Sequence, residues 1–162
     1  MHLIAMAAAA GITLNWDDFT DLSAVTPSLM QVYPNGQADI NHFQAAGGMS
    51  YLFRELLGAG LLHGDIPTVF GTDLTAYTQE PFLEDGKVVW HEGPEKSLDE
   101  DVLRPVATPF AATGGLTVMK GNLGRGVIKI SAVAEEHRIV EAPVKIFEDQ
   151  NEMKAAFESG DL

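Results

Sequence analysis

The sequence of 162 residues contains no cysteine. Without cysteine the chain cannot form a disulfide, and it offers no thiolate to a zinc ion or an iron–sulfur cluster. A small secreted scaffold held by disulfides is therefore excluded, and so is a thiolate metal site within these residues. Hydrophobic residues make up 46% of the sequence and charged residues 20%, which is typical of a globular protein with a core.

Basic residues are also few, because ten Lys and Arg stand against 23 Asp and Glu and give a net charge of −13. The ten are scattered along the chain and form no patch. Nucleic acids and anionic membranes are bound through clustered Lys and Arg. Neither is expected as a partner, and the acidic excess is interpreted as a source of solubility.

The sequence has no hydrophobic run long enough to span a bilayer. Residues 1–11 are apolar on every side, but the positively charged stretch that opens a signal peptide is missing. Helices that are apolar all round are usually buried inside a larger protein, and this one has no capping residue at its start. We therefore expect a cytoplasmic protein in which this helix belongs to a longer chain.

Residues 12–70 predict helices. Residues 15–18 supply polar groups that can cap a helix, and apolar residues follow at helical spacing until Pro27. A turn is predicted at residues 34–36, where Pro, Asn and Gly follow one another. Residues 66–70 are short and apolar and are predicted to form a strand.

A further helix is predicted from Asp39 to Leu57, with Asp39 as its capping residue. Gly47 and Gly48 lie inside it and together cost about 2 kcal/mol relative to alanine, so a break or a close backbone approach is expected there. Gly58 and Gly60 are expected to end the helix in the left-handed conformation.

Beyond residue 70 the pattern changes. Residues 82–90 predict a β-hairpin with Asp85-Gly86 as its turn, and residues 97–106 predict a short helix. Strands are predicted at 116–119, 126–133 and 138–147, because the apolar residues there recur with period two. Asp149 and Glu152 then resemble a capping box before a helix that Gly160 ends.

Three stretches carry a resemblance to a known family. They read VYPNGQADINHFQAAGGM at 32–49, YTQEPFLEDGKVVW at 77–90 and GGLTVMKGNLGRGVIKISAV at 114–133. The chain resembles the dihydroxy-acid dehydratase and phosphogluconate dehydratase family over its whole length. Family members are several times longer, so the chain is interpreted as an internal fragment of such a protein.

The resemblance implies an α/β fold, seen in this fragment as α+β. Residues 1–70 correspond to the helical end of a larger α/β domain, and residues 71–110 to an irregular connection that contains the hairpin. Residues 111–162 correspond to the opening strands and a helix of a C-terminal β-barrel-like domain. Three strands cannot close a barrel, so the fragment is expected to hold only part of it.

The resemblance also implies a function, the dehydration of 6-phosphogluconate to 2-keto-3-deoxy-6-phosphogluconate in the Entner–Doudoroff pathway. Family members use an iron–sulfur cluster and a magnesium ion, and commonly form homo-oligomers. The cluster cysteines lie upstream of this stretch and the serine thought to act as base lies downstream. No catalytic, cluster-binding or metal-binding residue is therefore assigned here, and the isolated chain is expected to be inactive.

Two alternatives stay open. The parent protein can be a dehydratase for another sugar acid or a dihydroxy acid, although YTQEPF and NHFQAAGG favour phosphogluconate. The chain can also be a non-catalytic binding or scaffolding domain that shares ancestry with the family. Exposed apolar faces on the first helix and on strand edges would favour the fragment over such a finished domain.

Two groups of residues are candidates for contact with the substrate. Asn41 and His42 begin a helix, where backbone N–H groups favour anions, but they can instead cap and pack the helix. No carboxylate or thiol partner can be identified for them from the sequence, so the structural role is favoured.

The second group lies in the glycine-rich loop 121–126 and beside it. Lys120, Asn122 and Arg125 can contribute to a phosphate site, because such a loop offers N–H groups and the cations offer charge. The loop has neither the Walker pattern nor the dinucleotide pattern. A tight connection between strands is the favoured role.

The other polar residues give no site. The five histidines show no metal-binding spacing. Asp17-Asp18 and the other acidic residues are interpreted as solvated caps and turns, and no serine has the setting of a hydrolase nucleophile.

Overall fold

The computed structural model describes residues 2–161; Met1 and Leu162, which the predicted first and last segments included, lie outside the described residues. Helix α1 spans His2–Ala9 and has no buried residue. Its side chains Leu3 and Met6 are 59% and 66% exposed. None of the helices within residues 2–161 has the length and apolar character needed to cross a membrane.

Helix α2 spans Trp16–Val25 and begins with the predicted polar cap. The Asn15 side chain accepts hydrogen bonds from the N–H groups of Asp17 and Asp18, while the Asp18 carboxylate accepts one from the N–H of Asn15. This reciprocal pair satisfies N–H groups that the first helical turn leaves free. The helix ends at Val25 with Thr26 as its C-cap, because Pro27 follows.

Helices α3 (Ile40–Ala45) and α4 (Gly48–Gly58) confirm the predicted break. Gly47 has φ +129° and Gly48 has φ +56°, values that L side chains rarely adopt. A Cβ on Gly47 would lie only 2.9 Å from the Cβ of Tyr51, so the glycine also permits a close approach. Beyond α4, Gly60 is left-handed with φ +70°.

One part of the predicted helix end is wrong, since Gly58 is not a left-handed cap. It is the last residue of α4, and Ala59 forms the cap in a right-handed conformation. The N–H of Ala59 still reaches the Glu55 carbonyl at 3.0 Å, so the helical hydrogen bonding continues one residue further than expected.

Strands β1 (Gln79–Glu84) and β2 (Lys87–Glu92) form the predicted hairpin in antiparallel register. Asp85 and Gly86 both have positive φ, at 48° and 75°, as a two-residue turn between twisted strands requires. The short 3₁₀ helix η1 (Leu74–Thr78) leads into β1.

A second hairpin is formed by β3 (Leu116–Gly121) and β4 (Gly124–Lys129). The chain then passes through the 3₁₀ turns η2 (Ile130–Ala132) and η3 (Glu135–His137) to helix α5 (Gln150–Ser159). Strand β4 therefore ends earlier than the expected residue 133.

The caps of α5 agree in part with the prediction. Asp149 caps the helix by accepting from the N–H of Asn151, and Gly160 ends it with φ +81°. The reciprocal bond that a capping box needs from Glu152 is not formed in the described residues.

Three other predicted elements are wrong. Residues 66–70 form a turn closed by Thr68 and Gly71 instead of a strand. Residues 97–106 form turns, because the N–H of Arg104 bonds the distant Leu29 carbonyl and not a helical neighbour. Residues 138–147 form no strand, since the described residues offer that segment no neighbouring strand with which to pair.

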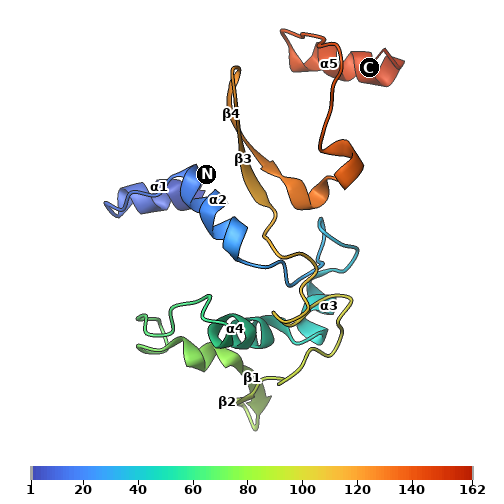
Figure 1. Ribbon diagram of the computed structural model, residues 1–162. Coiled ribbons are helices and arrows are strands. Elements are labelled where there is room, and N and C mark those ends of the chain that lie inside the picture. Colours follow the sequence, from blue (N-terminus) through green and yellow to red (C-terminus); the bar gives the residue numbers. More distant parts are fainter. Residues whose placement is uncertain (1, 162) are drawn as a thin grey trace.

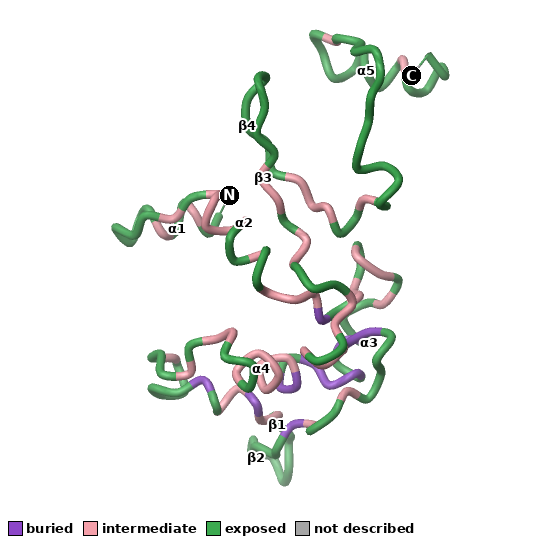
Figure 2. Tube along the Cα trace, in the orientation of Figure 1, coloured by how far each residue is buried: buried purple, intermediate pink, exposed green. Residues whose placement is uncertain are grey.

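The core is small and lies where α3 and α4 meet two extended segments, near residues 29 and 103. The N–H of Gln31 bonds the Val102 carbonyl and the N–H of Arg104 bonds the Leu29 carbonyl, which ties these segments together. Buried residues concentrate in this part of the chain, whereas the β3–β4 turn and most of α5 are exposed (Figure 2). The core residues are Leu29, Phe43, Ala46, Tyr51, Val102 and Leu103.

The arrangement is α+β, as predicted, with two small antiparallel sheets and no closed barrel among residues 2–161. Helices α3 and α4 and the β1–β2 hairpin gather in one region, while α2 runs beside β3 in another (Figure 1). The chain between β2 and β3 connects the two regions.

Candidate functional site

The first candidate group lies in the first turn of α3. Asp39 caps this helix, because its Oδ1 accepts from the N–H of Asn41 at 2.9 Å and from the N–H of His42 at 3.0 Å. Asn41 and His42 are therefore both bound to Asp39 through their backbone. The capping role that the sequence favoured for this turn is present.

The His42 ring has a carboxylate partner that sequence analysis did not identify. Its Nδ1 lies 2.8 Å from Asp39 Oδ1 and 3.3 Å from the Asp39 backbone nitrogen. Nδ1 must donate a proton to the first group and accept one from the second, so it cannot serve both fully. In one tautomer of the ring Nδ1 accepts from the Asp39 N–H, which completes the capping box, and in the other it donates to the Asp39 carboxylate.

The electrostatics of Asp39 reflect both the cap and the ring contact. Hydrogen bonds from the backbone and then from the ring of His42 hold the pKa of the Asp39 carboxyl below its ordinary value. The carboxylate is thus charged at neutral pH, and it both caps α3 and contacts the imidazole of His42.

His42 also lines a pocket of about 500 Å³ beside α3. Part of its wall is the turn after Val32, closed by a hydrogen bond from the N–H of Asn35 to the Val32 carbonyl. Gly36 permits this turn to approach residue 31, because a Cβ there would collide with the Gln31 carbonyl. The lining residues are Gln31, Gly36, Gln37, Ala38, His42, Asp101 and Val102.

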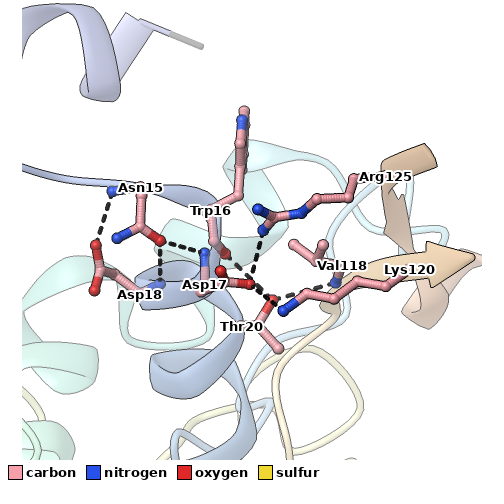
Figure 3. A network of polar contacts seen from close by, with 8 residues as sticks. All are labelled: Asn15, Trp16, Asp17, Asp18, Thr20, Val118, Lys120 and Arg125. Atoms are coloured by element: carbon pink, nitrogen blue, oxygen red, sulfur yellow. Dashed lines mark hydrogen bonds and ion pairs between the residues drawn. The ribbon is translucent and has the colours of Figure 1, made fainter.

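The second candidate group lies near the tip of the β3–β4 hairpin. Lys120 and Arg125 are opposite each other in the register, and Asn122 lies in the turn. Both cations reach one oxygen of Asp17, with Lys120 Nζ at 2.9 Å and Arg125 Nη2 at 2.8 Å from Oδ1. Figure 3 shows the two side chains converging on this carboxylate at the start of α2.

Asp17 neutralises part of the positive charge that a phosphate would need. The hydrogen bond from Lys120, together with the charge of Arg125, holds the pKa of Asp17 below its ordinary value. The turn next to this network borders a pocket of about 370 Å³ lined by residues 119–126. The geometry therefore gives Lys120 and Arg125 a definite role in joining the hairpin to α2.

Further contacts join α2 to β3 beyond Asp17, and we call this set of contacts the α2–β3 seam. Thr20 Oγ1 accepts from the N–H of Val118 at 3.2 Å, and Ser23 Oγ accepts from the N–H of Leu116 at 3.1 Å (Figure 3 shows the first). Side chains of α2 thus satisfy N–H groups on the outer edge of β3, which protects that edge from other strands.

The structure does not combine the two candidate groups into one site. Asn41 and His42 lie on α3, whereas Lys120, Asn122 and Arg125 lie on the β3–β4 hairpin in the other region (Figure 1). The pockets that the two groups line share no residue.

The contacts that anchor the β1–β2 hairpin were not predicted from the sequence. Buried Ser50 donates to Glu80 at 2.7 Å, and Arg54 donates to Glu92 at 3.2 Å and to the Gly93 carbonyl at 3.3 Å. These partners are 30 to 39 residues apart, so no local pattern indicates them. They fix the hairpin to α4.

The donor groups of this chain do not fit an iron–sulfur cluster, because the cluster needs thiolates and the sequence has no cysteine. Within residues 2–161, no group of three or more His, Asp or Glu side chains is placed to hold a metal ion. No chemical step is assigned to a metal or cluster on these residues.

Comparison with known proteins identifies the class. The family model described as dihydroxy-acid/6-phosphogluconate dehydratase N-terminal matches residues 1–77, and the C-terminal model of the same family matches residues 101–162. The chain belongs to the dihydroxy-acid/6-phosphogluconate dehydratase family.

The chain is 64% identical to a phosphogluconate dehydratase of Pseudomonas aeruginosa, over all of its residues and 27% of that protein. It is 57% identical to one of Escherichia coli, over 99% of the chain and 26% of that protein. A dihydroxy-acid dehydratase of Haloarcula marismortui is 34% identical over 93% of the chain and 24% of its own length. The chain thus spans about a quarter of the length of these relatives.

Proposed function

We propose that the chain forms part of a longer phosphogluconate dehydratase, a hydro-lyase. The difference in identity carries this proposal: 64% and 57% to proteins named phosphogluconate dehydratase, against 34% to one named dihydroxy-acid dehydratase. The exposed apolar side chains of α1 support the larger assembly, since a finished domain covers such surfaces.

The proposed reaction removes water from 6-phosphogluconate and gives 2-keto-3-deoxy-6-phosphogluconate in the Entner–Doudoroff pathway. A base must remove the proton at C2, and a Lewis acid must assist the departure of the C3 hydroxyl. An iron–sulfur cluster and Mg²⁺ belong to this proposal for the longer protein only. We place the protein in the cytoplasm as a homo-oligomer that binds neither nucleic acid nor membrane.

The proposed contribution of this chain is structural, and it follows the predicted division. Residues 1–70 form the last part of the N-terminal domain, and residues 111–162 form the first part of the C-terminal domain. Residues 71–110 connect the two domains. The family-model matches at 1–77 and 101–162 support this division. The pairing of Lys120 and Arg125 with Asp17 supports a role in holding the two parts together, with Asn122 forming the turn.

A segment exchange tests the proposal. The chain replaces the matching residues of the Pseudomonas aeruginosa phosphogluconate dehydratase, and dehydration of 6-phosphogluconate and of a dihydroxy acid is measured. The matching Escherichia coli segment in the same host is the positive control. We expect both chimeras to load the cluster, measured by visible absorbance, and to prefer phosphogluconate.

Either of two results would contradict the proposal. One is a folded, cluster-loaded chimera that is inactive on phosphogluconate while the Escherichia coli control is active. The other is a chimera that prefers the dihydroxy acid.

A further inference from the structure

The β1–β2 hairpin is a two-stranded sheet, and within residues 2–161 no third strand pairs with either of its edges. In a hairpin with a two-residue turn, the residues that flank the turn, Glu84 and Lys87, form a hydrogen-bonded pair, and such pairs recur at every second position. The bond from the N–H of Gly93 to the Thr78 carbonyl follows this alternation. The backbone groups of the residues between these pairs therefore point outward, away from the hairpin.

The two outward edges of this hairpin differ. On β1 the outward positions include Pro81, which has no N–H to offer, so this edge resists pairing. On β2 they include Val88 and Trp90, which are 63% and 41% exposed. Most of the hairpin is exposed along both strands (Figure 2). An exposed apolar edge of this kind is a site at which another strand can pair.

The edges of the other hairpin are less suited to pairing. The α2–β3 seam covers the edge of β3, where Thr20 and Ser23 accept from its N–H groups. Strand β4 is rich in glycine and carries Arg125 and Lys129, which disfavour pairing with a further strand. Among the strands of residues 2–161, the outer edge of β2 is thus the best suited to bind another strand.

The sequence of β2 fits a second copy of itself. Antiparallel pairing about a two-fold axis through Val89 places Val88 opposite the second copy's Trp90, and symmetry repeats this pair. Both residues have outward backbone groups, so each pair exchanges both of its N–H···O bonds. An aromatic side chain beside a β-branched one is also a favourable cross-strand pair. An axis through Trp90 would instead place Val88 opposite the charged Glu92.

The charges of the hairpin agree with this register. The chain carries a net charge of −13, so two copies repel each other unless their contact is locally balanced. With the axis through Val89, Lys87 lies opposite the second copy's His91. The ring of His91 lies 2.7 Å from Glu84 of its own hairpin, so Lys87 approaches a carboxylate of the second copy. The pairing therefore brings opposite charges together where the copies meet.

We propose that the outer edge of β2 is a homodimer interface, in which the β2 strands of two copies pair and join both hairpins into one sheet. Because Pro81 blocks the edge of β1, the sheet closes as a dimer and does not extend further. The proposal gives a contact surface to the homo-oligomer of the proposed function, but it rests on the geometry and charge of the hairpin alone.

Cross-linking tests the register. The chain has no cysteine, so Val89→Cys introduces its only thiol, at the two-fold axis. Residues opposite each other at such a position have Cα atoms about 4.5 Å apart, which a disulfide can span. Val88→Cys is the matched control, because residue 88 is the more exposed but does not lie opposite itself.

Under mild oxidation we expect Val89→Cys to form a disulfide-linked dimer several-fold faster than Val88→Cys, measured on non-reducing gels. An equal rate, or a faster one for Val88→Cys, would overturn the proposal, because random collisions favour the more exposed thiol.

Sedimentation equilibrium tests the edge itself. Val88→Pro removes an outward N–H and leaves the β1–β2 hydrogen bonds in place. Leu83→Pro makes the same change at the paired position on the blocked edge. We expect the parent and Leu83→Pro to dimerise alike, and the Kd of Val88→Pro to rise at least about tenfold, because symmetry removes two hydrogen bonds. A monomeric parent, or a dimer that Val88→Pro does not weaken, would contradict the proposal.

The segment-exchange chimera carries the test into the longer protein and separates it from the proposed function. We expect a disulfide-linked dimer when the chimera carries Val89→Cys and none when it does not, which controls for the cysteines of the host. An active chimera that fails to cross-link through residue 89 would overturn the interface and leave the dehydratase proposal standing. A cross-linked chimera that loads its cluster but is inactive would support the interface and reject the dehydratase proposal.

Discussion

The junction between α3 and α4 offers the sharpest test of the structural reasoning, through the substitution Gly47→Ala. Gly47 has φ +129°, and an alanine held there is strained by about 1–3 kcal/mol. Its Cβ would also lie 2.9 Å from Tyr51 Cβ and 3.3 Å from Pro94 Cγ. Tyr51 is 1% exposed, so it cannot move aside without disturbing the core, and such overpacking costs roughly 1–3 kcal/mol.

One effect opposes this loss, because alanine restricts the unfolded chain and returns about 0.4–1 kcal/mol. The expected net decrease in the free energy of unfolding is therefore about 1–5 kcal/mol. Gly58 provides the matched control at the other end of α4, since a Cβ added there would meet no neighbouring atom within 4 Å and its φ is not positive. Gly58→Ala should raise stability by roughly 0.5–1 kcal/mol.

Urea unfolding followed by circular dichroism measures both variants. The reasoning predicts that the midpoint falls for Gly47→Ala and rises slightly for Gly58→Ala. A Gly47→Ala protein as stable as the parent would refute the account of the α3–α4 break, since neither the strain nor the contact with Tyr51 would then exist.

Three further predictions concern the core, the contact between α4 and the β1–β2 hairpin, and the pairing of Asp17 with the β3–β4 hairpin. Leu103→Ala removes a fully buried side chain and should cost about 2–5 kcal/mol in urea unfolding, and a loss below about 1 kcal/mol would show that the site is not packed. Ser50→Ala deprives Glu80 of its buried donor and should cost about 1–2 kcal/mol, with faster amide exchange in β1–β2; unchanged exchange would contradict the anchor. Lys120→Met should raise the pKa of Asp17 towards its ordinary value in an NMR titration, and an unchanged pKa would disprove the pairing. In the parent, the Asp17 pKa is lowered, so its stabilising contribution is complete well above pH 3.8 and is lost as the pH falls below that value.

Local features were predictable from the sequence because neighbouring residues determine them. The cap at Asp39 and the turn at Asp85-Gly86 depend on side chains and φ values within a few positions. The break at Gly47 was predicted for the same reason. Each of these three features was found where the sequence placed it.

The failed predictions share a different cause, the influence of distant residues. Residues 97–106 have a helical pattern, but hydrogen bonds to residues near 29 hold them in turns. Residues 138–147 have strand periodicity, but a strand must pair with another strand. Among residues 2–161, no strand pairs with this segment. Propensity alone decides neither case.

The candidate sites also divide into contacts between neighbouring residues and contacts between distant ones. The pairing of His42 with Asp39 spans three residues, so the sequence contained the signal, although Asp39 was assigned only the role of capping residue. Asp17 instead meets Lys120 and Arg125 across more than 100 residues, and nothing local to Asp17 distinguishes it from a solvated cap. The interpretation of Asp17 as a simple cap was therefore incomplete.

The central claim is that these residues work as one part of a dehydratase whose cluster ligands lie elsewhere in the same polypeptide. The most direct test is the intact mass, with peptide mapping, of the native cellular protein that contains this sequence. The account predicts a mass several times that of the 162-residue chain, with cysteine-bearing peptides on its N-terminal side. A native product of these 162 residues alone would contradict the claim, because it would have no thiolate to hold the cluster.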